Sequence, residues 1–340
     1  MKNKKILKVM ALCLSLVLVL GMLAGCGKGD NPDVSSDITS EAAKDASVIN
    51  VAVIQGPTGV GMASLMEEDA NGKAEYDYEF QLLSEPQQTV ALLSNKSVDI
   101  AAMPTNLAAN FSAKGGDITL LAVNTLGVLY IADSTGEITD IESLRGKTIY
   151  STGQGSNPEY ILDYVLSKNG LDPDKDVKIE FLTENTELSA KLISGEAEIA
   201  LVPEPLLSTV TTKNPNVKPA LSMTEEWNKA GGEGELMMGC VVVRNEFLKN
   251  SPKAVESFMK AYEASVKACE NAETVAPLCV KHKIIAAEPI AKKAIPRCNI
   301  IFMTGAEMQT KLSGYFNVLL AANPKSIGEK LPDDAFYYKK

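Results

Sequence analysis

Histidine and tryptophan are almost absent from this 340-residue chain, which contains one of each, and aromatic residues make up only 6% of it. The single histidine, His282, stands between two lysines, where we expect a solvated helix residue. The six cysteines do not cluster in the sequence, so it contains no His/Cys constellation of the kind that holds a transition metal. Nucleophilic catalysis by serine or cysteine would also need a positioned base. We therefore expect no catalytic residue, no metal and no cofactor.

Clusters of basic residues are missing as well. The chain has 33 Lys and Arg against 43 Asp and Glu, a formal charge of −10, and its basic residues are dispersed. Binding to a phosphate backbone needs clustered basic residues, so a nucleic-acid partner is excluded. An apolar content of 45% is enough to bury a large core. For a chain of this length it predicts a globular protein with two lobes.

The chain begins with a segment typical of a secretion signal. Four lysines precede an apolar run that ends at Cys26, and this run is shorter than the roughly 20 residues that a membrane-spanning helix needs. We interpret residues 1–25 as a signal peptide outside the fold. Its removal takes away four positive charges and leaves a formal charge of −14. The polar residues 26–47 contain few hydrophobes and are typical of a flexible tether.

The tetrapeptide LAGC, residues 23–26, resembles the bacterial lipobox, in which the cysteine becomes the lipid-bearing N-terminus. The resemblance implies a lipid anchor on Cys26 and a place on the extracytoplasmic face of the cell membrane. The alternative is an ordinary signal peptide followed by a stray cysteine. An exported location permits disulfides, and Cys269 and Cys279 are the nearest pair in the body of the chain. Buried free thiols are the alternative for these two residues.

Two segments about 100 residues apart are similar. VALLSNKSVDIAAMPTNLA, residues 90–108, aligns with SAKLISGEAEIALVPEPLLS, residues 189–208. Upstream, INVAVIQGPTGVGMASL, residues 49–65, aligns with GKTIYSTGQGSNPEYIL, residues 146–162. Each copy has the pattern strand, Gly-rich loop, helix, strand, helix, strand. This pattern predicts two parallel βαβαβ units.

Two such units predict an α/β protein of two lobes, each a mostly parallel sheet flanked by helices. Open sheets of this kind bind ligands at the carboxyl ends of their strands, so the repeated loops should face each other across a cleft. The apolar segments ITLLAVNTLGVLYIAD and ELMMGCVVVRNEF are suited to crossing between the lobes. We therefore assign residues 48–132 and 236–340 to lobe 1 and residues 133–235 to lobe 2.

The lipobox, the repeated loops and the order of the repeated segments together resemble a solute-binding lipoprotein of a bacterial ABC importer. Within that class the chain is similar to the nitrate/sulfonate/taurine-type and NMT1/THI5-like binding proteins over residues 49–320. The resemblance implies a two-lobed periplasmic-binding-protein fold of type II that captures a small solute by closure. It also implies delivery to a membrane permease driven by a separate ATPase, and we expect a monomer. Two alternatives stay open: a pyrimidine-precursor enzyme of the same family, for which a Cys-rich motif is missing, and a membrane-tethered ligand sensor.

The stretch GPTGVGMA, residues 56–63, nearly matches a nucleotide-binding P-loop. However, Met62 and Ala63 stand where that loop needs Lys and Ser or Thr. The duplication favours a different function, in which glycines let backbone N–H groups at a helix start approach a small ligand. The alternative is a tight turn with a capping hydroxyl or amide. The candidate binding residues in the two copies are Gly56, Pro57, Thr58 and Gly59, and Gly155, Ser156 and Asn157.

Five further candidates come from the strand ends and the rare aromatics. Thr105 and Asn106 follow one repeated strand, and Glu204 follows the matching strand of the second copy. The Glu204 carboxylate either accepts a hydrogen bond from a ligand or caps the next helix. Tyr130 and Trp227 are candidates for stacking on a flat ligand. The alternatives are packing at the hinge for Tyr130 and anchoring of a loop for Trp227.

The four loops that hold these candidates are residues 56–59, 105–106, 153–158 and 204–205, and they contain no lysine or arginine. The lack of basic residues disfavours a doubly charged phosphate as the ligand. A small carboxylate or sulfonate held by N–H groups, or a planar heterocycle such as a vitamin precursor, both remain as candidate ligands.

We predict that Cys26→Ala abolishes lipid attachment, because this thiol is the expected acylation point. Metabolic labelling with a fatty-acid analogue should show no incorporation, and the protein should appear in the medium or stay unprocessed. Labelling equal to that of the unmodified chain would contradict the anchor.

Overall fold

A computed structural model describes residues 45–231 and 234–339, which belong to one compact unit, Lys44–Lys340. The expected signal peptide, the anchor Cys26 and nearly all of the tether lie outside the described residues. Within the described part of the chain, the structure has no helix with the length and apolar character to cross a membrane.

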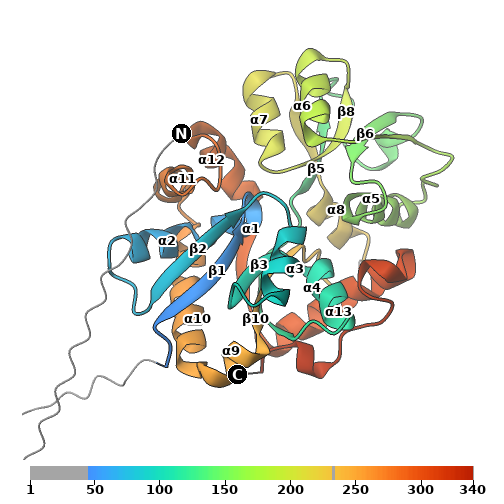
Figure 1. Cartoon of the computed structure of the whole chain (residues 1–340). Helices are drawn as coiled ribbons and strands as arrows, with labels where there is room; N and C mark the ends of the chain where they lie inside the picture. The colour runs from blue at the N-terminus through green and yellow to red at the C-terminus, as the bar shows by residue number, and fades with distance from the viewer. Residues whose placement is uncertain (1–44, 232–233, 340) are drawn as a thin grey trace, which may run out of the picture. The chain divides into compact units, whose positions relative to one another are not determined.

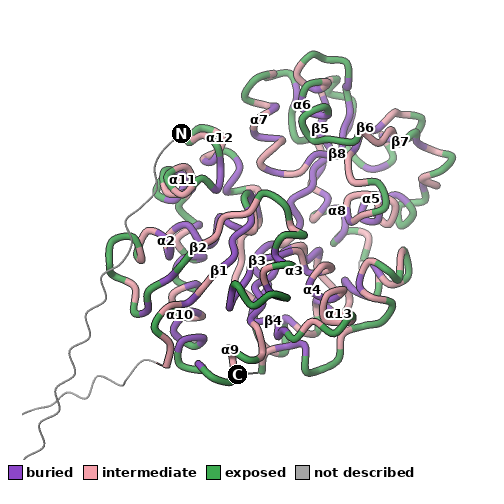
Figure 2. Tube along the Cα trace, viewed as in Figure 1, coloured by how far each residue is buried: buried purple, intermediate pink, exposed green. Residues whose placement is uncertain are grey.

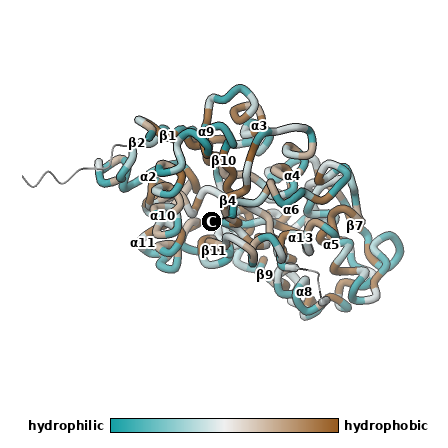
Figure 3. The backbone as a smooth tube through the Cα atoms, turned by 90° about the horizontal axis from the view of Figure 1, so that it is seen from below, coloured by the Kyte–Doolittle hydropathy of each residue, from teal (hydrophilic) through white to brown (hydrophobic). Residues whose placement is uncertain are grey.

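The first sheet has six strands in the order β11-β4-β10-β3-β1-β2. β1 pairs in parallel with β2 and β3, whereas β10 pairs antiparallel with β3 and β4, and β11 antiparallel with β4. β4 is buried along its whole length (Figure 2), β10 is buried up to Arg244, and most of their residues are hydrophobic (Figure 3). The bounds are β1 Val48–Ile54, β2 Asp77–Leu83, β3 Ile100–Pro104, β4 Ile118–Thr125, β10 Gly239–Arg244 and β11 Ile300–Met303.

The second sheet has five strands in the order β7-β6-β8-β5-β9. β6 pairs in parallel with β7 and β8, and β5 pairs antiparallel with β8 and β9. Both sheets are therefore mixed, although most strands of each run in one direction. The bounds are β5 Leu129–Asp133, β6 Thr148–Thr152, β7 Lys178–Leu182, β8 Ile199–Pro203 and β9 Lys218–Ser222.

The predicted duplication corresponds to matching parts of the two sheets. β3-β1-β2 and β8-β6-β7 have the same order and the same parallel pairing, and each pair is joined by helices. Figure 1 shows α5, α6 and α7 gathered with β5, β6 and β8, and α3 and α4 beside β3. The helices of the two units are α1 Pro57–Val60, α2 Ala63–Ala70, α3 Gln87–Ser94 and α4 Thr105–Ala113, and α5 Asn157–Lys168, α6 Asn185–Ser194 and α7 Leu206–Lys213.

Additional helices surround the two sheets, and α10 is strongly amphipathic. It begins after Ser251 with a proline in its first turn, as the sequence predicts. Val255, Phe258 and Tyr262 recur at helical spacing and are fully buried. Burial of each such side chain contributes about 1.5–3 kcal/mol. The remaining helices are α8 Met223–Lys229, α9 Asn245–Asn250, α10 Pro252–Ala268, α11 Ala272–Lys281, α12 Glu288–Ala294 and α13 Gly305–Ala322, with 3₁₀ turns η1 Glu142–Leu144, η2 Ile295–Arg297, η3 Pro324–Ser326 and η4 Asp334–Phe336.

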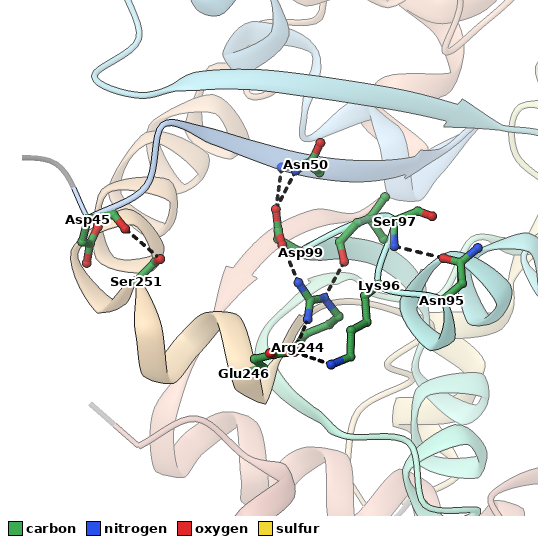
Figure 4. Close-up of polar contacts among 10 residues, drawn as sticks. Asp45, Asn50, Asn95, Lys96, Ser97, Asp99, Arg244, Glu246 and Ser251 are labelled. Carbon is green, nitrogen blue, oxygen red and sulfur yellow. Dashed lines mark hydrogen bonds and ion pairs between the residues drawn. The ribbon is translucent and has the colours of Figure 1, made fainter. Parts of the chain in front are cut away.

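The repeated acidic residue at the start of β3 has a structural role at the end of the sheet away from the repeated loops. Asp99 accepts hydrogen bonds from the backbone N–H and the amide of Asn50 on β1, each at 2.9 Å. Its other oxygen accepts from the Arg244 guanidinium on β10 at 2.7 Å (Figure 4). This buried cluster ties three neighbouring strands together.

The first crossing segment differs from the sequence expectation. Residues 118–133 are two strands in different sheets rather than one, with 126–128 as the link between them. β5 pairs only with β8 and β9, so the second sheet begins at Leu129, four residues before the boundary expected at 133. Gly127 lies in the link, where a Cβ atom would come within 2.2 Å of Thr224 Oγ1 and 2.6 Å of Leu236 Cδ2.

We predict that Gly127→Ala lowers the free energy of unfolding by roughly 1–3 kcal/mol, because the added methyl group overpacks the link. Urea denaturation of the purified full chain measures the change. The buried Thr224 hydroxyl has no hydrogen-bond partner among the described residues, so Thr224→Ala should cost little by itself. Gly127→Ala/Thr224→Ala should recover part of the lost stability. No difference between the single and the double variant would contradict this steric account.

Candidate functional site between the two sheets

A cavity of about 400 Å³ lies where loops from both sheets meet. Its walls come from the loops after β1, β3, β6 and β8, the start of α3 and the two links between the sheets. This is the carboxyl edge of the parallel strands, where open α/β sheets bind ligands. The lining residues are Pro57, Thr58, Pro86, Gln87, Pro104, Asn106, Leu107, Thr125, Val128, Ser156, Asn157, Pro158, Pro203, Glu204, Met238 and Gly239.

The first Gly-rich loop divides into a cavity wall and a tight turn. Pro57 and Thr58 line the cavity, and the Thr58 carbonyl accepts from the Asn124 amide at 3.3 Å. Gly56 adopts a positive φ of 92° before α1 and donates its N–H to the Ile284 carbonyl, so it shapes the turn. Gly59 is also structural, because a Cβ there would lie 2.4 Å from a carbonyl oxygen of β1. Gly56 and Gly59 therefore do not line the cavity.

The second Gly-rich loop is organised by its own side chains. The Ser156 hydroxyl lines the cavity but donates back to the Gly153 carbonyl at 2.5 Å. Gly155 lies outside the cavity, in a groove between α5 and α13, and its N–H donates to the carboxylate of Glu159. This carboxylate stands in the first turn of α5, where the helix dipole favours a negative charge.

Asn106 and Asn157 face each other across the cavity. The Asn157 amide donates to Asn106 Oδ1 at 3.2 Å and so joins the start of α4 to the start of α5. Thr105, the neighbour of Asn106, does not line the cavity. It is fully buried, and its hydroxyl donates to the Met237 carbonyl at 2.6 Å, which holds the second link between the sheets, residues 236–238, against β3. In this structure the Thr105 hydroxyl is therefore engaged in a structural contact, and its role in ligand binding stays a prediction.

Glu204 lines the cavity and also caps a helix. Its carboxylate accepts from the N–H and the hydroxyl of Ser208 in α7, each at 3.1 Å. The same carboxylate accepts from the Arg297 guanidinium at 2.5 Å, and Arg297 donates a second hydrogen bond to the Ser208 hydroxyl at 2.9 Å. Because the Glu204 side chain is fully buried, this ion pair balances its charge inside the protein.

The sequence gives no sign of Arg297. It lies in η2, 93 residues after Glu204, and α12 packs against α7 to bring the two together. No sequence motif surrounds Arg297. Its contact with Glu204 depends on the packing of α12 against α7, two helices that are far apart in the chain.

Neither predicted aromatic lines the cavity. Tyr130 on β5 is 7% exposed, and its hydroxyl donates to the Arg297 carbonyl at 3.0 Å. Its burial raises the pKa of the phenol to about 12. Trp227 in α8 is fully buried, with its ring 4.3 Å from that of Tyr164. In this structure Tyr130 packs beside the link between the sheets, and Trp227 packs in the core and donates its Nε1–H to the Gly234 carbonyl at 3.3 Å. These positions correspond to the second alternative for each residue, a hinge residue and a loop anchor.

The structure also accounts for the histidine and the cysteines. His282 is not a freely solvated residue, because it ends α11 with its Nε2 3.0 Å from a Glu67 carboxylate oxygen. The expected pair Cys269 and Cys279 are separate buried thiols, and burial raises the pKa of both to about 12. Residues 45–231 and 234–339 contain no group of three His, Cys, Asp or Glu side chains that could hold a metal ion.

Sequence comparison matches residues 75–273, more than half of the chain, to the family described as NMT1/THI5 like. The chain belongs to the NMT1/THI5-like family. It is also 26% identical over 185 residues to a Bacillus subtilis (strain 168) protein named "Putative binding protein YtlA". That match covers 53% of each chain, so this chain spans about half the length of the curated relative it matches.

Solved structures confirm the two-lobed α/β fold of this NMT1/THI5-like chain. A Parabacteroides distasonis ABC transporter structure aligns with a TM-score of 0.73 at 24% identity, over 87% of this chain and 100% of the other. The ligand-binding component of an ABC-type import system from Staphylococcus aureus, with zinc bound, aligns at 0.67 and 15% identity, over 86% and 97%. The periplasmic aliphatic sulphonate-binding protein SsuA from Escherichia coli aligns at 0.64 and 14% identity, over 87% and 94%.

We predict that Glu204 and Arg297 are energetically coupled. Glu204→Gln and Arg297→Met should each lower the free energy of unfolding by roughly 1–3 kcal/mol, because the first leaves a partly buried guanidinium and the second a fully buried carboxylate without its partner. The Arg297 side chain is 29% exposed, so water offsets part of the loss in Glu204→Gln.

A double-variant cycle in urea measures the coupling, which should reach roughly 1–3 kcal/mol. Additive losses would show that the two side chains do not stabilise the protein as a pair.

Proposed function

We propose that this protein is the solute-binding component of an ABC importer and captures a small organic solute in the cavity between its two sheets. The observation that carries this proposal is that both repeats contribute the same loops to one cavity. Membership of the NMT1/THI5-like family and the fold shared with ABC-importer binding components support it.

Closure of the two lobes is the proposed mode of capture. Two short links, residues 126–128 and 236–238, connect the sheets, and an apolar cluster that includes Trp227 and Tyr315 packs between the lobes away from the cavity. Beside the cavity itself the contacts between the lobes are polar. The hydrogen bond from Asn157 to Asn106 and the ion pair of Glu204 with Arg297 both span the lobes. Polar contacts of this kind can break and reform around a ligand more readily than a continuous apolar core.

The proposal places the protein on the extracytoplasmic face of the membrane, held by a lipid on Cys26 and the tether of residues 26–47. It acts there as a monomer that delivers its ligand to a permease. ATP hydrolysis then belongs to a separate ATPase, in line with Met62 and Ala63 at the P-loop-like positions.

Binding without catalysis fits the groups around the cavity. Glu204 is the one ionisable side chain among the lining residues, and Arg297 and Ser208 already hold its carboxylate. General acid–base catalysis needs a group that can exchange a proton with the substrate. Relatives named as binding proteins support the same conclusion. A membrane-tethered sensor would use the same cavity and differs only in its partner.

We predict that one or more members of a panel of sulfonates, carboxylates, pyrimidines and flavins raises the melting temperature of the full chain. A ligand at 100 times its Kd contributes about 2.7 kcal/mol, which corresponds to a rise of roughly 5 °C. X-ray scattering should show a smaller radius of gyration with the same ligand. No shift with any member would contradict solute binding.

A matched pair of variants locates the site. Leu107→Trp fills the cavity, so it should abolish the ligand-induced shift while the protein stays folded. Leu331→Trp makes the same change at an exposed position and should keep the shift. A shift that survives Leu107→Trp would place the ligand elsewhere.

A further inference from the structure

One edge strand of the first sheet carries none of the residues that usually protect such an edge. The two described sheets end in β2 and β11, and in β7 and β9. β2 and β7 each contain two charged residues, and β9 contains a lysine and a proline. β11 has the sequence IIFM, without a charge or a proline. Charges and prolines keep the unpaired backbone groups of an edge from pairing with another chain, so β11 is open to such pairing.

A groove follows this strand. Two hollows of about 580 Å³ and about 470 Å³ share Leu126, Glu263, Ile301 and Phe302 in their walls, so they adjoin and form what we call the β11 groove. One wall is β11, and the other is the face of α10 that packs beside it (Figure 3). The α10 residues of this face recur at helical spacing, and they are Glu256, Met259, Lys260, Glu263, Val266 and Lys267.

The groove has the length and the floor for an extended peptide. The face from Glu256 to Lys267 is roughly 17 Å long, which corresponds to about five or six residues of a β-strand. The floor is apolar, because it consists of Leu126, Met259 and the four side chains of β11, which are only partly buried. Proteins bind extended peptides at such free edges, where main-chain hydrogen bonds supply affinity and neighbouring pockets take alternate side chains.

Carboxylates outnumber lysines along the rim of the groove. The lining glutamates are Glu235, Glu256, Glu263, Glu270 and Glu307, and the lining lysines are Lys260 and Lys267. Lys311, outside the lining, pairs with Glu235 and Glu307. No ion pair engages Glu263 or Glu270 within the described part of the chain. The rim therefore favours a segment with basic side chains, and the floor favours apolar ones.

Neither the chain's own tether nor a second copy matches this charge. Residues 26–47 contain five acidic residues, two lysines and few hydrophobes. Pairing of β11 with the β11 of a second copy would bring two acidic rims together, and like charges across an interface are unfavourable. The groove therefore fits a segment of a different protein.

We propose that the β11 groove binds an extended basic segment of a partner protein. The backbone of that segment adds to the first sheet as a strand beside β11, its apolar side chains fill the floor, and its lysines or arginines meet the glutamates of α10. The groove shares no lining residue with the solute cavity, so this inference does not depend on the proposed function. It borders Leu126 in the first link and Glu235 beside the second, so a bound segment contacts both connections between the sheets.

Three synthetic peptides test the mode of binding. The peptide KIKVKIKV combines alternate lysines with apolar residues, EIEVEIEV reverses its charge, and KIKVKIKV N-methylated at every backbone amide keeps the side chains without a hydrogen-bond donor. Calorimetric titration of the full chain should give the tightest binding for unmethylated KIKVKIKV. The other two should bind at least about tenfold more weakly, because one meets like charges and the other cannot form the strand pairing.

Variants of the groove provide the second readout. Ile301→Lys gives β11 a charge of the kind that the other three edge strands carry, so affinity for KIKVKIKV should fall at least about tenfold. Glu263→Lys, at an exposed position, should lower that affinity roughly threefold or more and raise the affinity for EIEVEIEV. The matched control Glu187→Lys makes the same change at an exposed position on α6 and should bind as the unmodified chain does. Melting temperatures check that each variant is folded; if Ile301→Lys is not, Glu263→Lys carries the test.

Four results would overturn this inference. They are no binding of KIKVKIKV to the unmodified chain, equal binding of its methylated form, tighter binding of EIEVEIEV, and binding that the folded groove variants leave unchanged. A dimer in sedimentation that Ile301→Lys dissociates would give the groove to a second copy instead. None of these results bears on solute binding, which the solute panel and Leu107→Trp test separately.

Discussion

In both sheets the repeated strands run parallel, and a parallel pair requires a crossover helix that returns the chain to the same edge. All the strand-to-helix loops of one repeat therefore collect at the carboxyl edge of their sheet. The other features of the site depend on this constraint. Because the two links are short, the two carboxyl edges meet, and the loops after β1, β3, β6 and β8 line one cavity.

The last part of the chain then sets the electrostatics of that cavity. α12 and η2 follow the first sheet's strand β10 in sequence, yet they reach α7 and place Arg297 on Glu204. Without this guanidinium the cavity would present a buried carboxylate and favour a cationic ligand. With it, the charge of Glu204 is balanced inside the protein. The same ion pair also joins the two lobes.

Much of the fold could be predicted because hydrophobic pattern and repetition are properties of consecutive residues. The βαβαβ units, the start of α10 at Ser251 and the α/β class all follow from such local patterns, and the structure confirms them. The strand change at Leu129 was not predicted, because an unbroken apolar run does not show where a strand leaves one sheet and joins another. Gly127, which marks that point, is identified by its close neighbours Thr224 and Leu236.

The candidate site was predictable only in part. Pro57, Thr58, Asn106, Ser156, Asn157 and Glu204 line the cavity, and each follows a repeated strand. Four other predicted residues stand in the same loops but do not line the cavity. Gly56 and Gly59 belong to the tight turn before α1, Thr105 contacts the second link, and Gly155 lies in the groove between α5 and α13. Tyr130 and Trp227 were considered because aromatics are rare, and rarity says nothing of whether a ring faces a ligand or the core.

The sequence alone therefore determined the repeat, the parallel units and the loops from which a binding site could be built, because these depend on residue order and spacing. Only the tertiary structure decided which loop residues line the cavity, that Arg297 neutralises Glu204, and that Asn157 donates to Asn106 across the cavity. Those facts depend on distances between residues far apart in the chain, such as the 93 positions between Glu204 and Arg297. Such distances are set by the packing of whole helices and sheets against each other.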